Sequence, residues 1–278
     1  MSLISPQTLK NWLPPILVSN LKTISRSSVS LRGKYSNWQE ALSGCEGYDT
    51  DEILERTLAA AQKVKRGHAA YQRDGELFNQ IIYSWPVTTA LMFAAAQNNG
   101  NLNVVDFGGS FANSYFQNKK FLDSLKSVQW RVVEQKSVVD AGSRHLACQE
   151  ISFHSDLHQC LQNNLPNMVL LSSVLQYLEN PVDFLAQLLK YKVSLIVLDR
   201  TPFLKRPDSS YVRIQKVPKR IYRASYPCWL FSRDELAGSF FDNGYDLVEE
   251  FDSLDDLSPE AIWQGLIFRY PPNNSLSQ

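Results

Sequence analysis

The strongest constraint on the fold is an alternation of short apolar runs with helix-length stretches after residue 100. The apolar runs are residues 102–107, 129–133, 150–153, 168–172 and 195–198. Helical stretches such as residues 115–125 and 181–189 separate them. Strands that alternate with helices along a chain form a parallel sheet with helices packed on its faces. The run 169–171 is apolar on both faces of the pleat, which indicates a central strand.

The end of the chain predicts a different kind of strand pairing. One more helix is expected at residues 232–241, and two strand-like runs follow at 245–251 and 262–270. A loop joins these two runs where a parallel pair would need a crossover helix, so we expect an antiparallel hairpin at the edge of the sheet.

The first hundred residues have a helical pattern instead. An apolar stripe at residues 53–64 ends before Gly67, and a second helix is expected over 76–97, with a kink or break near Pro86. We therefore predict two parts, a helical N-terminal extension or lid at 1–99 and an α/β domain at 100–278.

Composition narrows the function classes. The 28 basic and 28 acidic residues cancel, so bulk charge gives no indication of a nucleic-acid partner. No apolar run is long enough to span a membrane, and no secretory signal begins the sequence. The four cysteines form no CxxC pair, which is typical of reduced thiols in a cytoplasmic protein.

The turn after the first of these strands predicts a cofactor site. The strand ends in the acid Asp106, Gly108 and Gly109 follow, and a helix begins between Ser110 and Asn113. Glycines let the backbone approach a ligand, and free amides at a helix start favour an anionic group. The dinucleotide pattern G-x-G-x-x-G is absent. The turn also departs from the common methyltransferase form D-x-G-x-G-x-G, since Ser110 and Ala112 stand at its second and third glycine positions. The turn alone would equally fit an ordinary strand-to-helix connection.

A second acid makes the turn more informative. Glu134, followed by Gln135, ends the next strand, 28 positions after Asp106 (134 − 106). An acid at this place can accept hydrogen bonds from both ribose hydroxyls of a nucleoside cofactor. The pair indicates a nucleoside site but does not separate S-adenosylmethionine (SAM) from NAD.

Five blocks of sequence resemble a known family. They read VVDFGGSFANSYFQ, WRVVEQ, VLLSSVLQYLENP, LDRTPF and IYRASYPCWLFSRDEL. Together with weaker upstream similarity they cover about residues 35–270 and resemble a small family of bacterial SAM-dependent methyltransferases, often associated with surface-polysaccharide biosynthesis. The resemblance implies a Rossmann-like class I SAM-methyltransferase sheet, and it leaves the acceptor open.

The resemblance also implies a role for individual residues. The methionine part of SAM is expected against Asp106, Gly108, Gly109 and Ser110, and the ribose on Glu134 beside Gln135. Ser172 and Ser173 of the fourth-strand loop would line the cofactor. Ala112 departs from the family, whose members tend to have glycine there.

The proton acceptor for methyl transfer is harder to assign. His154 follows the third strand and His68 lies in a turn after the first helix, so either is a candidate base. Tyr177, Asp199 and Arg200 are expected around the acceptor. A structural role for each histidine and an ion pair of Asp199 with Arg200 are the alternatives. His154 and His158 lack the spacing of known zinc sites, and we expect no metal.

Residues 221–231 are rich in aromatic side chains. These would form a lid or a wall on which a sugar stacks, or else they would pack in the core or at a homodimer interface. Lys216, Lys219, Arg220 and Arg223 would attract a phosphate or form a solvated face.

The leading hypothesis is a SAM-dependent methyltransferase acting on a small-molecule or carbohydrate-linked acceptor. The alternatives are an NAD-type oxidoreductase or epimerase and a non-catalytic SAM-binding protein.

Overall fold

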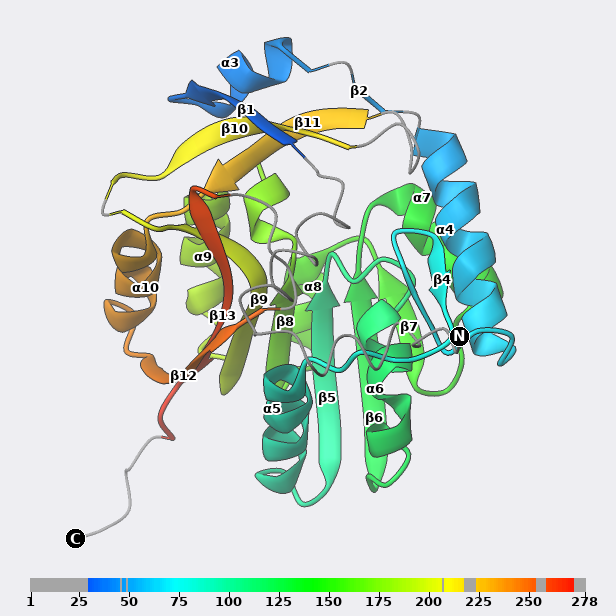
Figure 1. Ribbon diagram of the computed structural model, residues 1–278. Coiled ribbons are helices and arrows are strands. Elements are labelled where there is room, and N and C mark those ends of the chain that lie inside the picture. The colour runs from blue at the N-terminus through cyan, green and yellow to red at the C-terminus, as the bar shows by residue number, and fades with distance from the viewer. Residues whose placement is uncertain are drawn as a thin grey trace, which may run out of the picture.

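The computed structural model describes residues 30–45, 47–48, 50–206, 208–217, 224–253 and 259–272. Its centre is a seven-stranded sheet with the order β12-β13-β9-β8-β5-β6-β7 (Figure 1). The strands are β5 (Asn101–Phe107), β6 (Ser127–Val133), β7 (Ile151–His154), β8 (Met168–Ser172), β9 (Leu195–Leu204), β12 (Asp246–Asp252) and β13 (Ala261–Arg269). The first five are parallel, and β13 pairs antiparallel with both β9 and β12. The predicted fold, a Rossmann-like, mostly parallel sheet with a closing antiparallel hairpin, is confirmed.

Helices cover both faces of this sheet (Figure 1). One face carries α4 (Thr50–Lys65), α5 (Trp85–Ala96), α6 (Asn113–Leu122) and α7 (Lys136–His145), and the other carries α8 (Leu157–Asn163), α9 (Pro181–Leu189) and α10 (Arg233–Phe241). Successive strand residues point to opposite faces, so Val104 packs in the first layer and Val105 in the second. The strand β8 is buried on both faces, as its unbroken apolar run predicts.

A second sheet, which the sequence did not predict, lies across the carboxyl ends of the parallel strands (Figure 1, top). It contains β1 (Ser30–Tyr35), β10 (Tyr211–Lys216), β11 (Ala224–Leu230) and β2 (Gly47–Tyr48), in the order β1-β10-β11-β2. Helix α3 (Trp38–Ser43) packs on it through Ala41, beside Val212 and Ile214. Chain segments on both sides of residue 100 thus build one cap.

The N-terminal part contains more strand than expected. The predicted helix at 76–97 is wrong in its first half, because Glu76–Phe78 forms strand β4 in a hairpin with β3 (Tyr71–Arg73). Helix α5 begins only at Trp85, which places Pro86 in its first turn. Backbone N–H groups in the first turn of a helix form no intrahelical hydrogen bond, so a proline, which has no N–H, is tolerated there. The division of the chain near residue 100 stays a prediction.

The fifth parallel strand is also longer than predicted. Residues 195–198 were expected, but β9 continues to Leu204 because Thr201 to Leu204 pair with Gln264 to Ala261 of β13. Asp199 and Arg200 therefore lie within the strand. Asp199 nevertheless stands opposite Ser172, the last residue of β8, and so remains at the carboxyl edge. Among the described residues, no helix has the length and apolar character needed to cross a membrane.

Candidate functional site

The site begins with a buried carboxyl at the end of β5. Asp106 is 1% exposed, and its Oδ2 accepts a hydrogen bond of 3.0 Å from the indole Nε1 of Trp130. Its Oδ1 is also buried and accepts no hydrogen bond from any residue that the structure describes. Burial raises the pKa of Asp106 to about 7, with Glu134 adding to the rise and the Trp130 bond opposing it. A buried oxygen without a partner indicates a place for a donor from a ligand.

The turn after β5 needs both of its glycines. Gly108 has a φ of +71°, and a Cβ there would lie 2.4 Å from Val174 Cγ2. A Cβ on Gly109 would lie 2.4 Å from Asp106 Oδ2. Ser110 and Ala112 are left-handed as well, with φ of +51° and +60°. L-residues are strained at such φ values, so the turn holds backbone strain at both positions.

Glu134 holds this turn from the neighbouring strand. Its Oε1 accepts a hydrogen bond of 3.1 Å from the backbone N–H of Ser110, and its Oε2 accepts one of 2.9 Å from that of Gln135. Burial raises the pKa of Glu134, and these two bonds oppose the rise. Each carboxylate oxygen keeps a second lone pair, so the fixed carboxylate can still accept from two ligand hydroxyls.

The ends of β8 and β9 form one hydrogen-bonded network beside this turn. Ser172 Oγ donates to Asp199 Oδ2 at 2.7 Å, and Arg200 Nε donates to Ser172 Oγ at 3.2 Å. Gln176 Nε2 donates to Ser173 Oγ at 3.1 Å and to the carbonyl of Arg200 at 3.2 Å. Ser173 and Arg200 both have a positive φ, of +56° and +53°. Strained backbone of this kind persists where surrounding contacts hold it, and it is frequent at functional sites.

Tyr177 joins this loop to the second sheet. It closes the short 3-10 helix η1 (Leu175–Tyr177), and its hydroxyl donates to Gln215 Oε1 at 3.2 Å. Gln215 Nε2 in turn donates to the hydroxyl of Tyr226 at 3.1 Å, and the two tyrosine rings meet edge to face at 5.2 Å. Burial strongly raises the pKa of Tyr177. Its hydroxyl is therefore a neutral bridge in this network.

The β3–β4 hairpin reaches the same edge, which the sequence interpretation missed. Gln72 is 2% exposed; its Nε2 donates to Asn113 Oδ1 at the start of α6, and its Oε1 accepts from the backbone N–H of Gly75 at 3.1 Å. Burial raises the pKa of Tyr71 on the same hairpin, and the charge of Arg200 opposes that rise. The Asp74–Gly75 dipeptide, a hairpin-turn signal, could have revealed this element.

The two candidate histidines lie in different places. His154 ends β7, where its Nε2 shares a hydrogen bond of 2.8 Å with Ser152 Oγ, and burial lowers its pKa. His68 is exposed and follows α4, whose Lys65 donates to the carbonyls of His145 and Leu146 at the end of α7. That end of α7 leads back to the start of β7, so the structure does not bring His68 to the carboxyl edge.

The aromatic segment is only partly described, because residues 221–223, Lys219 and Arg220 lie outside the described residues. Tyr226 and Trp229 belong to β11, and the Trp229 indole Nε1 donates to the carbonyl of Leu178 at 3.1 Å. Trp229 and Phe231 pack against the core cluster under α9 and α10. Within the described part of the chain, no three histidine, cysteine or acidic side chains gather as a metal site.

Comparisons with known proteins give fold-level likeness only. No protein-family model matches the sequence, and no curated protein does. The N-terminal domain of EvdMO1 with SAH bound matches with a TM-score of 0.49 and 14% identity, covering 81% of this chain and 98% of that chain. The glycopeptide N-methyltransferase MtfA complexed with sinefungin matches with a TM-score of 0.46 and 13% identity, over 66% and 93% of the two chains.

A third match is CalS10, an amino pentose methyltransferase from Micromonospora echinaspora, with a TM-score of 0.43 and 11% identity over 68% of this chain and 92% of that one. These identities and TM-scores are too low to carry an argument about activity.

Proposed function

We propose that this protein is a SAM-dependent methyltransferase that acts on a small-molecule or carbohydrate-linked acceptor. One observation carries the proposal. A buried carboxyl oxygen of Asp106 has no partner among the described residues, and the fixed carboxylate of Glu134 stands on the neighbouring strand, with the two-glycine turn between them. A nucleoside that bears a charged amino-acid tail fits this set of groups.

The fit can be stated group by group. Asp106 would accept from the α-amino group of SAM, and backbone amides after Gly108 and Gly109 would receive its carboxylate. Glu134 would accept from the two ribose hydroxyls, beside Gln135. Ser110, and Ser172 and Ser173 after β8, would line the cofactor.

The strand order favours SAM over NAD. The dinucleotide fold has the order 3-2-1-4-5-6 in a parallel sheet. Here the last strand, β13, lies antiparallel between the fifth parallel strand and β12. Together with the missing third glycine of the dinucleotide pattern, this argues against the oxidoreductase alternative.

When bound, SAM supplies an electrophilic methyl group, which passes to an oxygen or nitrogen of the acceptor with loss of a proton. The residues of this chain would mainly align the acceptor and exclude water. We place the acceptor between Arg200, Asp199 and the β3–β4 hairpin, because burial, strained backbone and hydrogen bonding converge there. Arg200 would orient the acceptor, and Asp199 would take its proton directly or through water.

The remaining candidates receive narrower roles in this proposal. Tyr177 would form part of the wall of the acceptor site, since its hydroxyl is held by Gln215 of the second sheet. His154 would border the adenine, because it ends the strand next to β6. His68 receives no role, since it lies away from the carboxyl edge.

We also propose a place in the cytoplasm and an acceptor from polysaccharide biosynthesis. The four free thiols support a reducing compartment. The sequence resemblance supports the acceptor class. A homodimer through the face of β11 is a further proposal, supported only by the aromatic content of that strand.

A turnover assay tests the function. Purified protein is incubated with SAM and a panel of free sugars, nucleotide sugars and small amines, and S-adenosylhomocysteine (SAH) is measured. We expect SAH to form with at least one acceptor and to fall strongly in an Asp199→Asn variant, with Asp246→Asn, an exposed carboxylate on β12, as the matched control. Firm SAH binding without turnover on any acceptor would favour a non-catalytic SAM-binding protein.

A further inference from the structure

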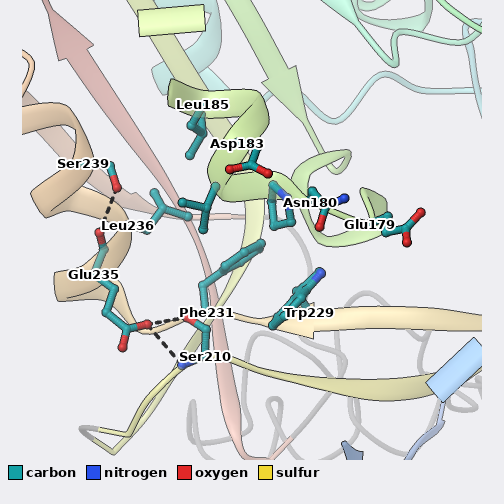
Figure 2. Close-up of a pocket in the computed structure, with 12 residues that line it drawn as sticks. Glu179, Asn180, Asp183, Leu185, Ser210, Trp229, Phe231, Glu235, Leu236 and Ser239 are labelled. Atoms are coloured by element: carbon teal, nitrogen blue, oxygen red, sulfur yellow. Dashed lines mark hydrogen bonds between the residues drawn. The ribbon is translucent and has the colours of Figure 1, made fainter. Parts of the chain in front are cut away.

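A cavity is lined by Glu179, Asn180 and Pro181, which follow η1 in the chain, and the proposed function makes no use of it. It has a volume of about 300 Å³ and lies between the start of α9, one side of α10 and the end of β11 (Figure 2). Trp229 closes one wall, held by its hydrogen bond to the carbonyl of Leu178, directly after η1. The cavity is at the small end of the range for ligand pockets.

The floor of this cavity is apolar and aromatic. Leu185 of α9 and Leu236 of α10 line it together with Phe231, and all three side chains are buried. The rings of Trp229 and Phe231 are nearly parallel, at 18°, with centroids 6.4 Å apart. At the rim, Val182 is 68% exposed.

The charged side chains around this apolar floor are all negative. Glu179, Asp183 and Glu235 line the cavity, and no lysine, arginine or histidine is among its described lining residues. Two of these carboxylates have partners, since Gln39 Nε2 donates to Glu179 at 2.6 Å and Ser210 Oγ donates to Glu235 at 2.7 Å. With three carboxylates and no cation among the described lining residues, the potential at the cavity is negative.

We propose that this cavity binds a small organic cation, a protonated amine or guanidinium on an apolar body. The body would pack on Trp229 and Phe231, where a cation near an aromatic face is also stabilised. The charged group would lie toward Asp183 at the start of α9, opposite these rings (Figure 2). The three carboxylates are exposed at the rim of the cavity, where they repel an anion and attract a cation. This inference does not depend on the proposed function, because it uses no residue of the cofactor edge.

Matched probes test the proposal on the full-length protein. Binding of phenethylamine, phenethyl alcohol and 3-phenylpropionate is followed by NMR through the indole N–H signal of Trp229, assigned by its loss in Trp229→Phe. We expect saturable binding of the amine alone, with a shift of that signal. Asp183→Asn should weaken it about three- to fivefold. Asp234→Asn, on α10 but with its side chain 92% exposed and outside the cavity, should leave the affinity unchanged.

The opposite results would overturn the proposal. Equal binding of the alcohol or the carboxylate would remove the charge argument. No saturable binding of the amine at millimolar concentration, or an affinity indifferent to Asp183→Asn, would remove the site. Competition by SAH would assign the amine to the cofactor edge instead. Because the titration is carried out with and without SAH, it separates failure of this proposal from failure of the methyltransferase proposal.

Discussion

Replacing Gly109 by alanine tests how closely the cofactor turn approaches Asp106. The added Cβ would lie 2.4 Å from Oδ2 and 2.7 Å from Oδ1 of Asp106, so the buried carboxylate has to move. The Trp130 indole then loses its acceptor at 3.0 Å. A buried donor without a partner costs about 1–3 kcal/mol. We expect Gly109→Ala to lower the free energy of unfolding by about that amount, and to weaken SAH binding about tenfold or more because the carboxylate no longer faces the ligand.

Denaturant unfolding and calorimetric titration with SAH measure the two effects. Gly238→Ala in α10 is the matched control, since nothing lies within 4 Å of the Cβ that it adds. Alanine is favoured over glycine inside a helix by about 0.5–1 kcal/mol, so the control should gain stability and keep its SAH affinity. If Gly109→Ala bound SAH as tightly as the unchanged protein, the placement of Asp106 at the ligand would be refuted.

Three further predictions concern the same edge. SAH affinity should rise roughly five- to tenfold from pH 6.0 to pH 7.5, because Asp106, with a pKa of about 7, must lose its proton to bind an ammonium group; calorimetry on Asp106→Asn should show a flat profile. Glu134→Gln should weaken SAH binding by about 10- to 100-fold through loss of charged hydrogen bonds, while Glu249→Gln on exposed β12 changes nothing; equal affinities would remove the ribose assignment. Gln72→Ala should speed hydrogen exchange in β3 and β4 by releasing the hairpin from Asn113, and raise the acceptor KM with SAH affinity unchanged; unaltered exchange would contradict this anchoring role.

The central sheet could be predicted because its signals are local. The expected strand Met168–Ser172 and helix Pro181–Leu189 agree with the structure at both ends. Apolar runs and helical periodicity depend only on neighbouring residues. The closeness of Asp106 and Glu134 could be predicted as well, because the carboxyl ends of parallel strands meet at one edge of a sheet. Asp106 pairs with Val132, two residues before Glu134.

The second sheet could not be predicted in the same way. Its strand β1 pairs with β10, and Ser30 stands opposite Lys216, a contact between distant parts of the sequence. Such pairing leaves no periodic trace within either segment. The length of β9 was missed for a related reason, because Thr201 to Leu204 become strand only through β13.

Within the site, sequence spacing located residues on strand ends but gave no information on loops. His68 was a candidate base because it lies in a turn after a helix, yet the end of α4 lies beside the end of α7, where Lys65 donates to the carbonyl of His145. Gln72 and Tyr71 were missed because the predicted helix at 76–97 included Glu76–Phe78, the strand that pairs with theirs. A side-chain bond from Gln72 to Asn113 ties the hairpin to the start of α6, and such a contact between distant segments has no local sequence signal.

The central claim, that the edge formed by Asp106 and Glu134 holds SAM, is tested most directly by calorimetric titration with SAH and with NAD. The account predicts one SAH site per chain, no binding of NAD, and SAH affinity that falls in both Asp106→Asn and Glu134→Gln. Binding of NAD without SAH would contradict it, and so would SAH binding that neither substitution weakens.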